Sequence, residues 1–422
     1  MFSFKKYLWS VLKSPSLGML AIFTGGNIFA SLLGGVGGLI QAHWVSPEVY
    51  GEFRKYGILT TYFAIGTAFV HDGLCRQFPY YLGCGNREKA LLVAGVAKWW
   101  YLFVSFVFTF FFLIVTFFAL FNCDWNGVFG WLTQISVTIG SIYGAFLGVM
   151  YRTSSDFKRL SYNTIFSTLI SVFTLPFVKL FGFLGLAIRL AGTNLFSIWI
   201  NRRYLPVKVT ARFNWQELKS LMAMSLRFSI PGYLDTSALS ATFSAILLFA
   251  CGQESVGLFA FALGLRTLVM AFNQSLTQIF NVKINLKYGE TKNFRYCLVY
   301  SAYPSLCAIF VSLGIYVISV IMVGPFIRFV LPEYVAAIPL INILFLGVIT
   351  SAMCLPLTLT RAAAMYNAIY AQCVGQIGTA LLLLSFLPHD PVTIAWIQVL
   401  SGLGNCIGGY IFILRKYLKQ EA

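Results

Sequence analysis

Long apolar stretches follow one another along the whole chain, separated by short polar connections. About twelve of them are long enough to cross a bilayer, whose hydrocarbon core needs about 20 helical residues. They cover residues 18–42, 53–73, 90–121, 128–150, 161–181, 183–200, 228–250, 257–280, 297–323, 337–360, 366–387 and 391–414. This pattern predicts an all-α, polytopic membrane protein.

Basic residues gather in alternate connections, and this alternation predicts the orientation of the chain. If both termini are cytoplasmic, 23 of the 30 Lys and Arg residues fall in cytoplasmic segments. Such a bias toward basic cytoplasmic loops sets the orientation of multi-pass proteins. We therefore predict a protein of the cell (inner, cytoplasmic) membrane with both termini cytoplasmic. The net charge of +17 then needs no nucleic-acid partner, although a soluble protein of this charge would suggest one.

The composition leaves no room for a soluble catalytic domain. Only 10% of the residues are charged, against about 25% in ordinary soluble domains. The nine Cys show neither a C-x-x-C motif nor a metal-ligand spacing. No catalytic Ser-His-Asp or phosphate-loop pattern is present either. We expect no metal, no cofactor and no catalytic residues, and hence a transporter rather than an enzyme.

The chain carries a sign of internal duplication. The pattern E-x-x-G-x-F occurs at residues 48–53 and again at 254–259, an offset of 206 residues. A duplication would give two six-helix bundles with parallel orientation, and transporters place their substrate between such halves. The alternative is that the motif only begins a helix twice. The predicted segments are a leader 1–17, a bundle 18–200, a linker 201–227, a bundle 228–414 and a tail 415–422, with the amphipathic leader and the tail cytoplasmic.

Ionisable residues inside the apolar stretches are the candidate functional residues, because they are costly in lipid and mark cavities or pathways. The predicted substrate-binding cavity cations are Arg266, Arg54, Arg189, Lys98 and Lys55. Each has a structural alternative. Arg266 and Arg189 could belong to buried ion pairs, Arg54 and Lys55 could form surface pairs with nearby Glu residues, and Lys98 could extend toward the membrane surface.

Two carboxylates complete the candidates. Asp235 follows Pro231-Gly232, which loosens the helix backbone. It is either the partner of a buried cation or a coupling site for a proton or another cation. Asp72 lies four residues before Arg76, a spacing at which helical residues form ion pairs, and the alternative is a place in the transport pathway.

Several of these segments resemble polysaccharide (O-antigen, Wzx-type) flippases. Residues 45–53 resemble the "LGPEEYGLF"-like loop after that family's first span, and residues 253–260 are similar to the loop before its eighth span. Asp72-Gly73-Leu74, Ile230-Pro231 and residues 331–334 also fit. Two features depart from the family pattern: His43-Trp44 stand where small or aliphatic residues are usual, and twelve spans rather than fourteen point away from lipid II flippases.

The resemblance implies a fold and a function. The family belongs to the multidrug/oligosaccharidyl-lipid/polysaccharide (MOP) exporter superfamily, whose MATE-like fold is a V-shaped pair of bundles. Its members flip a polyprenyl-diphosphate-linked oligosaccharide from the inner to the outer leaflet by alternating access, for polysaccharide, O-antigen and lipopolysaccharide synthesis. The implied partners are this lipid-linked substrate, the bilayer, and polysaccharide polymerase and chain-length machinery.

Two other functions stay open at this point. A cation-coupled multidrug exporter of the same superfamily would want a buried carboxylate in the first half and few cavity cations. A lipid-linked-sugar polymerase or ligase would need a sizeable outer loop that holds Arg and His. The identity of the sugar and of any coupling ion does not follow from the sequence.

Overall fold

Helices account for nearly all of the chain, as expected where lipid offers the backbone no hydrogen-bond partners. The computed structural model describes residues 15–154, 156–291, 293–363 and 365–419. The helices of the first half are α2 (Pro15–Trp44), α3 (Pro47–Phe63), α4 (Ile65–Ala68), α5 (His71–Gly83), α6 (Arg87–Phe121), α7 (Trp125–Thr153), α8 (Phe157–Phe173), α9 (Leu175–Phe181) and α10 (Phe183–Arg203). Those of the second half are α11 (Trp215–Tyr233), the π-helix η1 (Leu234–Ala238), α12 (Leu239–Thr291), α13 (Phe294–Val330), the 3₁₀-helix η2 (Pro332–Ala337), α14 (Ile338–Met353), the 3₁₀-helix η3 (Leu355–Leu357), α15 (Thr358–Ala362), α16 (Tyr366–Phe386) and α17 (Pro391–Lys419).

The described helices account for the predicted crossings. Ten helical runs in the described part of the chain are long and apolar enough to cross a membrane. One of them, Trp215–Gln274, is 60 residues long and contains two crossings, because the chain reverses at Gly252, where φ is +85°. Helix α2, with 30 residues, lies outside these runs and covers the first predicted stretch, 18–42. The expected all-α architecture is therefore confirmed.

Some helices differ from the predicted stretches. The second crossing is broken between α3 and α5, where Val70 has a non-helical φ of −131°. Helix α6, by contrast, agrees with the predicted stretch 90–121 to within three residues; its 35 residues are about 52 Å long, well beyond the roughly 30 Å of hydrocarbon. Only residues 204–214 of the predicted linker lack a helix, because α11 starts at Trp215. The predicted leader 1–17 lies almost wholly outside the described residues.

The two E-x-x-G-x-F motifs contact each other. A Cβ on Gly51 would overlap the backbone oxygen of Gln253, and a Cβ on Gly257 would overlap that of Pro47. Pro47 and Gln253 are themselves 206 residues apart, like the two glycines. The contact is therefore reciprocal, as expected of duplicated halves related by a two-fold axis, and only glycine allows the backbones so close.

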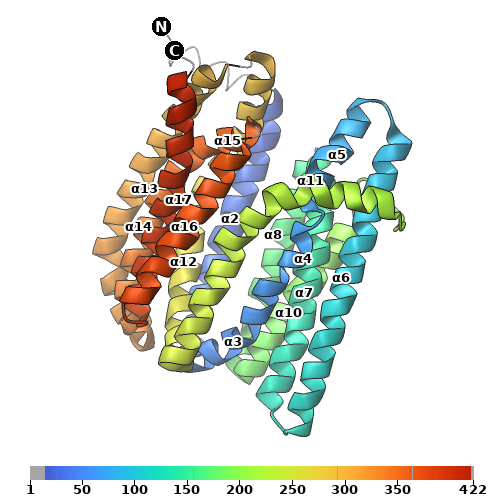
Figure 1. Cartoon of the computed structure of the whole chain (residues 1–422). Coiled ribbons are helices and arrows are strands. Elements are labelled where there is room, and N and C mark those ends of the chain that lie inside the picture. Colours follow the sequence, from blue (N-terminus) through green and yellow to red (C-terminus); the bar gives the residue numbers. More distant parts are fainter. Residues whose placement is uncertain (1–14, 155, 292, 364, 420–422) are drawn as a thin grey trace.

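This contact joins the halves at one end of the molecule. Figure 1 shows two groups of helices that meet where α3 and α12 touch and diverge toward the end where α17 finishes. The charge pattern predicts that the end where α17 finishes is cytoplasmic, and we call it the predicted cytoplasmic end. The end with the α3–α12 contact is the predicted outer end. Helix α11 crosses between the two groups near the predicted cytoplasmic end (Figure 1).

Candidate functional site

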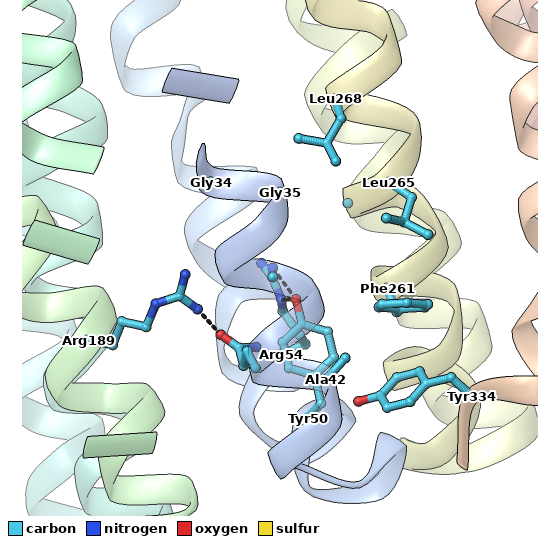
Figure 2. Close-up of a pocket in the computed structure, with 13 residues that line it drawn as sticks. Gly34, Gly35, Ala42, Tyr50, Arg54, Arg189, Phe261, Leu265, Leu268 and Tyr334 are labelled. Carbon is cyan, nitrogen blue, oxygen red and sulfur yellow. Dashed lines mark hydrogen bonds between the residues drawn. The ribbon is translucent and has the colours of Figure 1, made fainter. Parts of the chain in front are cut away.

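Two of the predicted cations meet in a cavity between the halves. Arg54 on α3 and Arg189 on α10 line a space of about 200 Å³. Figure 2 shows Arg189 approaching from one side and Phe261 and Leu265 of α12 lying on the other, with α2 between them. The remaining lining residues are Gly34, Gly35, Gly38, Gln41, Ala42, Tyr50, Gly264, Leu268 and Tyr334.

The start of each helix places both guanidinium groups at a similar depth. Ser46 caps α3 by accepting a hydrogen bond from Val49 N at 3.4 Å, and Arg54 follows seven residues after the helix begins at Pro47. Arg189 lies six residues into α10. At 1.5 Å per residue, both are about 10 Å from the predicted outer ends of their helices.

Each guanidinium is held by neutral partners. Arg54 donates from Nε and Nη2 to the Tyr50 hydroxyl, at 3.0 and 2.5 Å. Arg189 donates from Nε to the Ser171 carbonyl oxygen at 3.0 Å and from Nη1 to Gln41 Oε1. These contacts orient the cations but leave their charge uncompensated.

Two further cavities adjoin the first. One, of about 200 Å³, shares Gln41, Tyr50, Arg54 and Arg189 with it and extends into the first half. The other, of about 270 Å³, lies between α3 and α12 and also contains Arg54. Its hydroxyl-bearing lining residues are Thr61, Ser240, Ser244 and Thr267. Arg54 therefore lies where three spaces meet.

The cavity keeps a net positive charge. The ion pairs in the described part of the chain include Lys55–Glu52, at 3.7 Å, and Arg159–Asp156, at 3.5 Å. Neither cavity arginine belongs to one, and no acidic residue lines any of the three spaces. Arg54 is exposed and Arg189 half-buried. Unpaired cations within a membrane-spanning region mark a pathway or binding site, so the arrangement suits an anionic ligand that supplies the missing charge.

The structure does not bring the other three predicted cations to this cavity. Lys55 pairs with Glu52 and lies 5.0 Å from the ring centre of Tyr56. Lys98 donates to the Val209 carbonyl oxygen of the linker at 2.7 Å. It lies about 34 Å along α6 from Phe121, and hence near the predicted cytoplasmic surface rather than inside the bilayer.

Arg266 lies inside the second half. A Cβ on Gly347 of α14 would lie 3.2–3.3 Å from three of its guanidinium atoms. The Nε atom is buried and has no hydrogen-bond partner in the described part of the chain. Arg266 is therefore packed against α14 and does not line the three cavities.

Asp235 lies in the π-helix that follows Pro231, between α11 and α12. Its Oδ2 accepts a hydrogen bond from Asn405 at 3.3 Å, and its carbonyl oxygen accepts one from Gln376 at 2.8 Å. Asn405 also donates to Gln376 Oε1 at 2.6 Å. The second carboxylate oxygen, Oδ1, is buried without a partner among the described residues. A carboxylate with a free oxygen among amide groups can accept a proton or bind a cation.

Asp72 does not form the predicted pair with Arg76. Its Oδ2 accepts a hydrogen bond from Ser229 at 2.6 Å, and so links α5 to α11. The Arg76 guanidinium instead lies 3.7 Å from the ring centre of Phe228. Both residues therefore join the halves near the predicted cytoplasmic end, away from the Arg54–Arg189 cavity.

Sequence reasoning missed the neutral partners in the cavity. Gln41 is an isolated amide in an apolar stretch and lies seven residues after Gly34, on the same face of α2. Tyr50 lies inside the first E-x-x-G-x-F motif, four residues before Arg54. Both residues are recognisable in the sequence by these positions, but a search restricted to charged residues does not select them.

Comparison with known structures identifies the fold. The chain matches an inward-facing multidrug resistance MATE family transporter of the MOP superfamily with a TM-score of 0.67, at 15% identity over 92% of this chain and 94% of that one. A MOP superfamily transporter from Pyrococcus furiosus matches at 0.65, with 14% identity and 95% of each chain covered. The chain has the fold of MOP-superfamily transporters.

A flippase shares this fold. The lipid II flippase MurJ, in an inward closed conformation, matches with a TM-score of 0.62, at 14% identity over 93% of this chain and 87% of that one. Neither a protein-family model nor a curated protein matches the chain. At these identities the likeness establishes a multi-pass membrane fold of this class, while the substrate has to be argued from the cavity.

Proposed function

We propose that this protein is a flippase that moves a polyprenyl-diphosphate-linked oligosaccharide, the O-antigen type of repeat unit, from the inner to the outer leaflet. One observation carries the proposal: Arg54 and Arg189 line a cavity between the halves, and neither has an acidic partner among the described residues. The resemblance of residues 45–53 and 253–260 to O-antigen flippases supports the same substrate class.

The physical need for such a cavity lies in the head group. Moving an ion into a low-dielectric core costs on the order of 20 kcal/mol by idealised Born estimates. The polyprenyl tail can stay in lipid, whereas the diphosphate needs polar contacts along the way. Guanidinium groups bind phosphate oxygens in a bidentate manner, which suits Arg54 and Arg189 to this role.

Asp235 is our candidate coupling site. Its unpartnered Oδ1 lies in a π-helix, a local irregularity that is frequent at functional sites. A proton or small cation bound there would neutralise the carboxylate and weaken the charge-assisted hydrogen bond that it accepts from Asn405 of α17. In this proposal, Asp235→Asn lowers export while the protein level stays normal. Unchanged export would leave the Asp235 cluster with a purely structural role.

Arg266 is a third candidate contact for the substrate. Its Nε has no partner among the described residues, and a buried cation without an anion is unfavourable. We infer that it meets a phosphate group in another conformation of the transport cycle. Arg266→Ala should then abolish export at normal protein level, and Arg266→Lys should partly restore it. Normal export by the alanine variant would remove Arg266 from the pathway.

A cation-coupled multidrug exporter is the second candidate, because a MATE transporter shares the fold. Asp235 is the available carboxylate for coupling, but it lies in the second half, whereas such an exporter would want one in the first half. The cavity charge argues against it, since two uncompensated arginines repel cationic drugs. Drug sensitivity discriminates the two functions. An exporter predicts that deletion sensitises cells to cationic compounds, whereas a flippase predicts a defect in surface glycan.

The decisive experiment is deletion of the gene, followed by complementation. Deletion should remove surface glycan and leave lipid-linked repeat units on the inner leaflet, where the polymerase and chain-length machinery cannot use them. The wild type and Lys55→Ala should restore the glycan, and the Arg54→Ala/Arg189→Ala double variant should not. Lys55 is the matched control because it lies beside Arg54 but is paired with Glu52. Normal surface glycan in the deletion strain would refute the proposal.

A further inference from the structure

The linker between α10 and α11 is fixed along the side of α6. The Arg212 backbone N–H donates to the Gly95 carbonyl oxygen at 3.1 Å, and Lys98 Nζ donates to the Val209 carbonyl oxygen at 2.7 Å. Val209 is only 6% exposed. The linker is therefore packed against α6 over residues 209–212.

An aromatic wall continues from the linker onto α6. The ring centres of Phe213 and Trp99 are 4.6 Å apart. The Trp99 ring is in turn stacked on the Phe103 ring, with 5.2 Å between their centres. Phe213 is 59% exposed and Phe103 44% exposed. Phe106, one turn further along α6, is also exposed. Figure 1 shows α6 at the edge of the molecule. Because Phe103, Phe106 and Phe213 are exposed on this helix and on the linker packed against it, we expect them to contact lipid, with Phe213 nearest the predicted cytoplasmic surface.

Basic residues flank this wall in the sequence, and two of them lie near α6: Arg212 is beside Gly95, and Arg202 is close enough to Lys98 to repel it. The stretch 202–219 contains five Lys and Arg residues and one acid, Glu217. Arg202, Lys208, Arg212 and Lys219 are exposed, and none forms an ion pair within the described residues. Arg159, in another basic connection at this end, differs because it is paired with Asp156. The cations beside the wall therefore lack acidic partners of their own.

We propose that this surface, defined by Arg202 and Arg212 beside Trp99, Phe103 and Phe213, binds an anionic phospholipid of the inner leaflet. The aromatic rings take the upper part of the acyl chains, because Trp and Phe suit the boundary between lipid and water. The two guanidinium groups take the phosphate and the anionic head group. Phosphatidylglycerol is the simplest lipid with this chemistry. The site lies on the lipid-facing side of α6, apart from the Arg54–Arg189 cavity. It is independent of the flippase proposal.

The test uses the purified full-length protein, delipidated in detergent and titrated with phosphatidylglycerol or phosphatidylcholine. Native mass spectrometry measures bound lipid. Arg202→Gln/Arg212→Gln should weaken phosphatidylglycerol binding about 30-fold, because each basic residue near an anionic lipid contributes roughly fivefold. Phe213→Ala should weaken the binding of both lipids. The hydrogen bond from the Arg212 backbone N–H to the Gly95 carbonyl oxygen does not depend on these side chains, so the linker stays packed against α6.

The matched control is Arg87→Gln/Lys158→Gln, which removes the same charge from other exposed positions at the predicted cytoplasmic end. It should change phosphatidylglycerol binding less than about twofold, since the interaction falls off within a Debye length. Equal losses in the two double variants, or equal binding of the two lipids by the wild type, would overturn the proposal. Displacement of phosphatidylglycerol by an equimolar polyprenyl diphosphate would also overturn it, because the surface would then belong to the substrate.

Discussion

The reciprocal contact between Gly51 and Gly257 leads to the sharpest prediction. A methyl group on either glycine would overlap a backbone oxygen of the other half. A backbone oxygen cannot rotate away as a side chain can, so α3 and α12 must move apart. Gly51→Ala and Gly257→Ala should each destabilise the protein by about 1–3 kcal/mol, the usual cost of overpacking a close contact.

The double variant tests whether the two contacts act as one. The first methyl group forces α3 and α12 apart. The second methyl group then needs little further movement of the two helices. The double variant should therefore cost about as much as one single variant, and the two effects should not add, as expected for directly coupled sites. Denaturant titration in detergent measures the free energies of unfolding, and glycan export reports whether the predicted outer end still closes.

Gly144→Ala is the matched control, because a Cβ there would have nothing within 4 Å. It should be neutral or slightly stabilising, since alanine has the higher helix propensity. Full stability of both single variants, or fully additive costs in the double variant, would refute the reciprocal contact.

Three smaller predictions concern single contacts. Asn273→Ala removes hydrogen bonds to Ser312 Oγ (3.1 Å) and to a backbone carbonyl of α14 (3.0 Å), and should lower the free energy of unfolding by about 1–3 kcal/mol in denaturant titration. Ser225→Ala deprives the buried Gly73 N–H of its acceptor at 2.7 Å and should cost about 1–2 kcal/mol, measured in the same way. Lys55→Gln should change stability by less than about 1 kcal/mol, because its ion pair is solvent-accessible; a larger loss would show that Lys55 has a structural role.

The fold was largely predictable because lipid forces apolar stretches into helices. The reversal at Gly252 and the repeated motif also left clear signals in the sequence. The break at Val70 did not, since no proline stands between Pro47 and Pro79 to mark it. The length of α6 was also predicted closely, since the apolar stretch 90–121 covers all but the first three of its 35 residues.

The candidate site was predictable in part. Arg54 and Arg189 were expected to line a cavity, and they do meet in one. The position of a residue along an apolar stretch does not say which way its side chain points. Hydropathy therefore could not predict that Lys98 binds the linker or that Arg266 packs on α14. The neutral residues Gln41 and Tyr50 carry no charge signal, and their role emerges only where α2, α3 and α10 converge.

The central claim is that Arg54 and Arg189 hold an anionic diphosphate head group between the halves. Its most direct test is the binding of a radiolabelled polyprenyl diphosphate to the purified protein, compared between wild type, Lys55→Ala and Arg54→Ala/Arg189→Ala. We predict that Lys55→Ala binds like the wild type and that the double variant binds at least about 150-fold more weakly, since each of two lost hydrogen bonds to a charged group contributes about 1.5–3 kcal/mol. Equal binding by all three proteins would contradict the account.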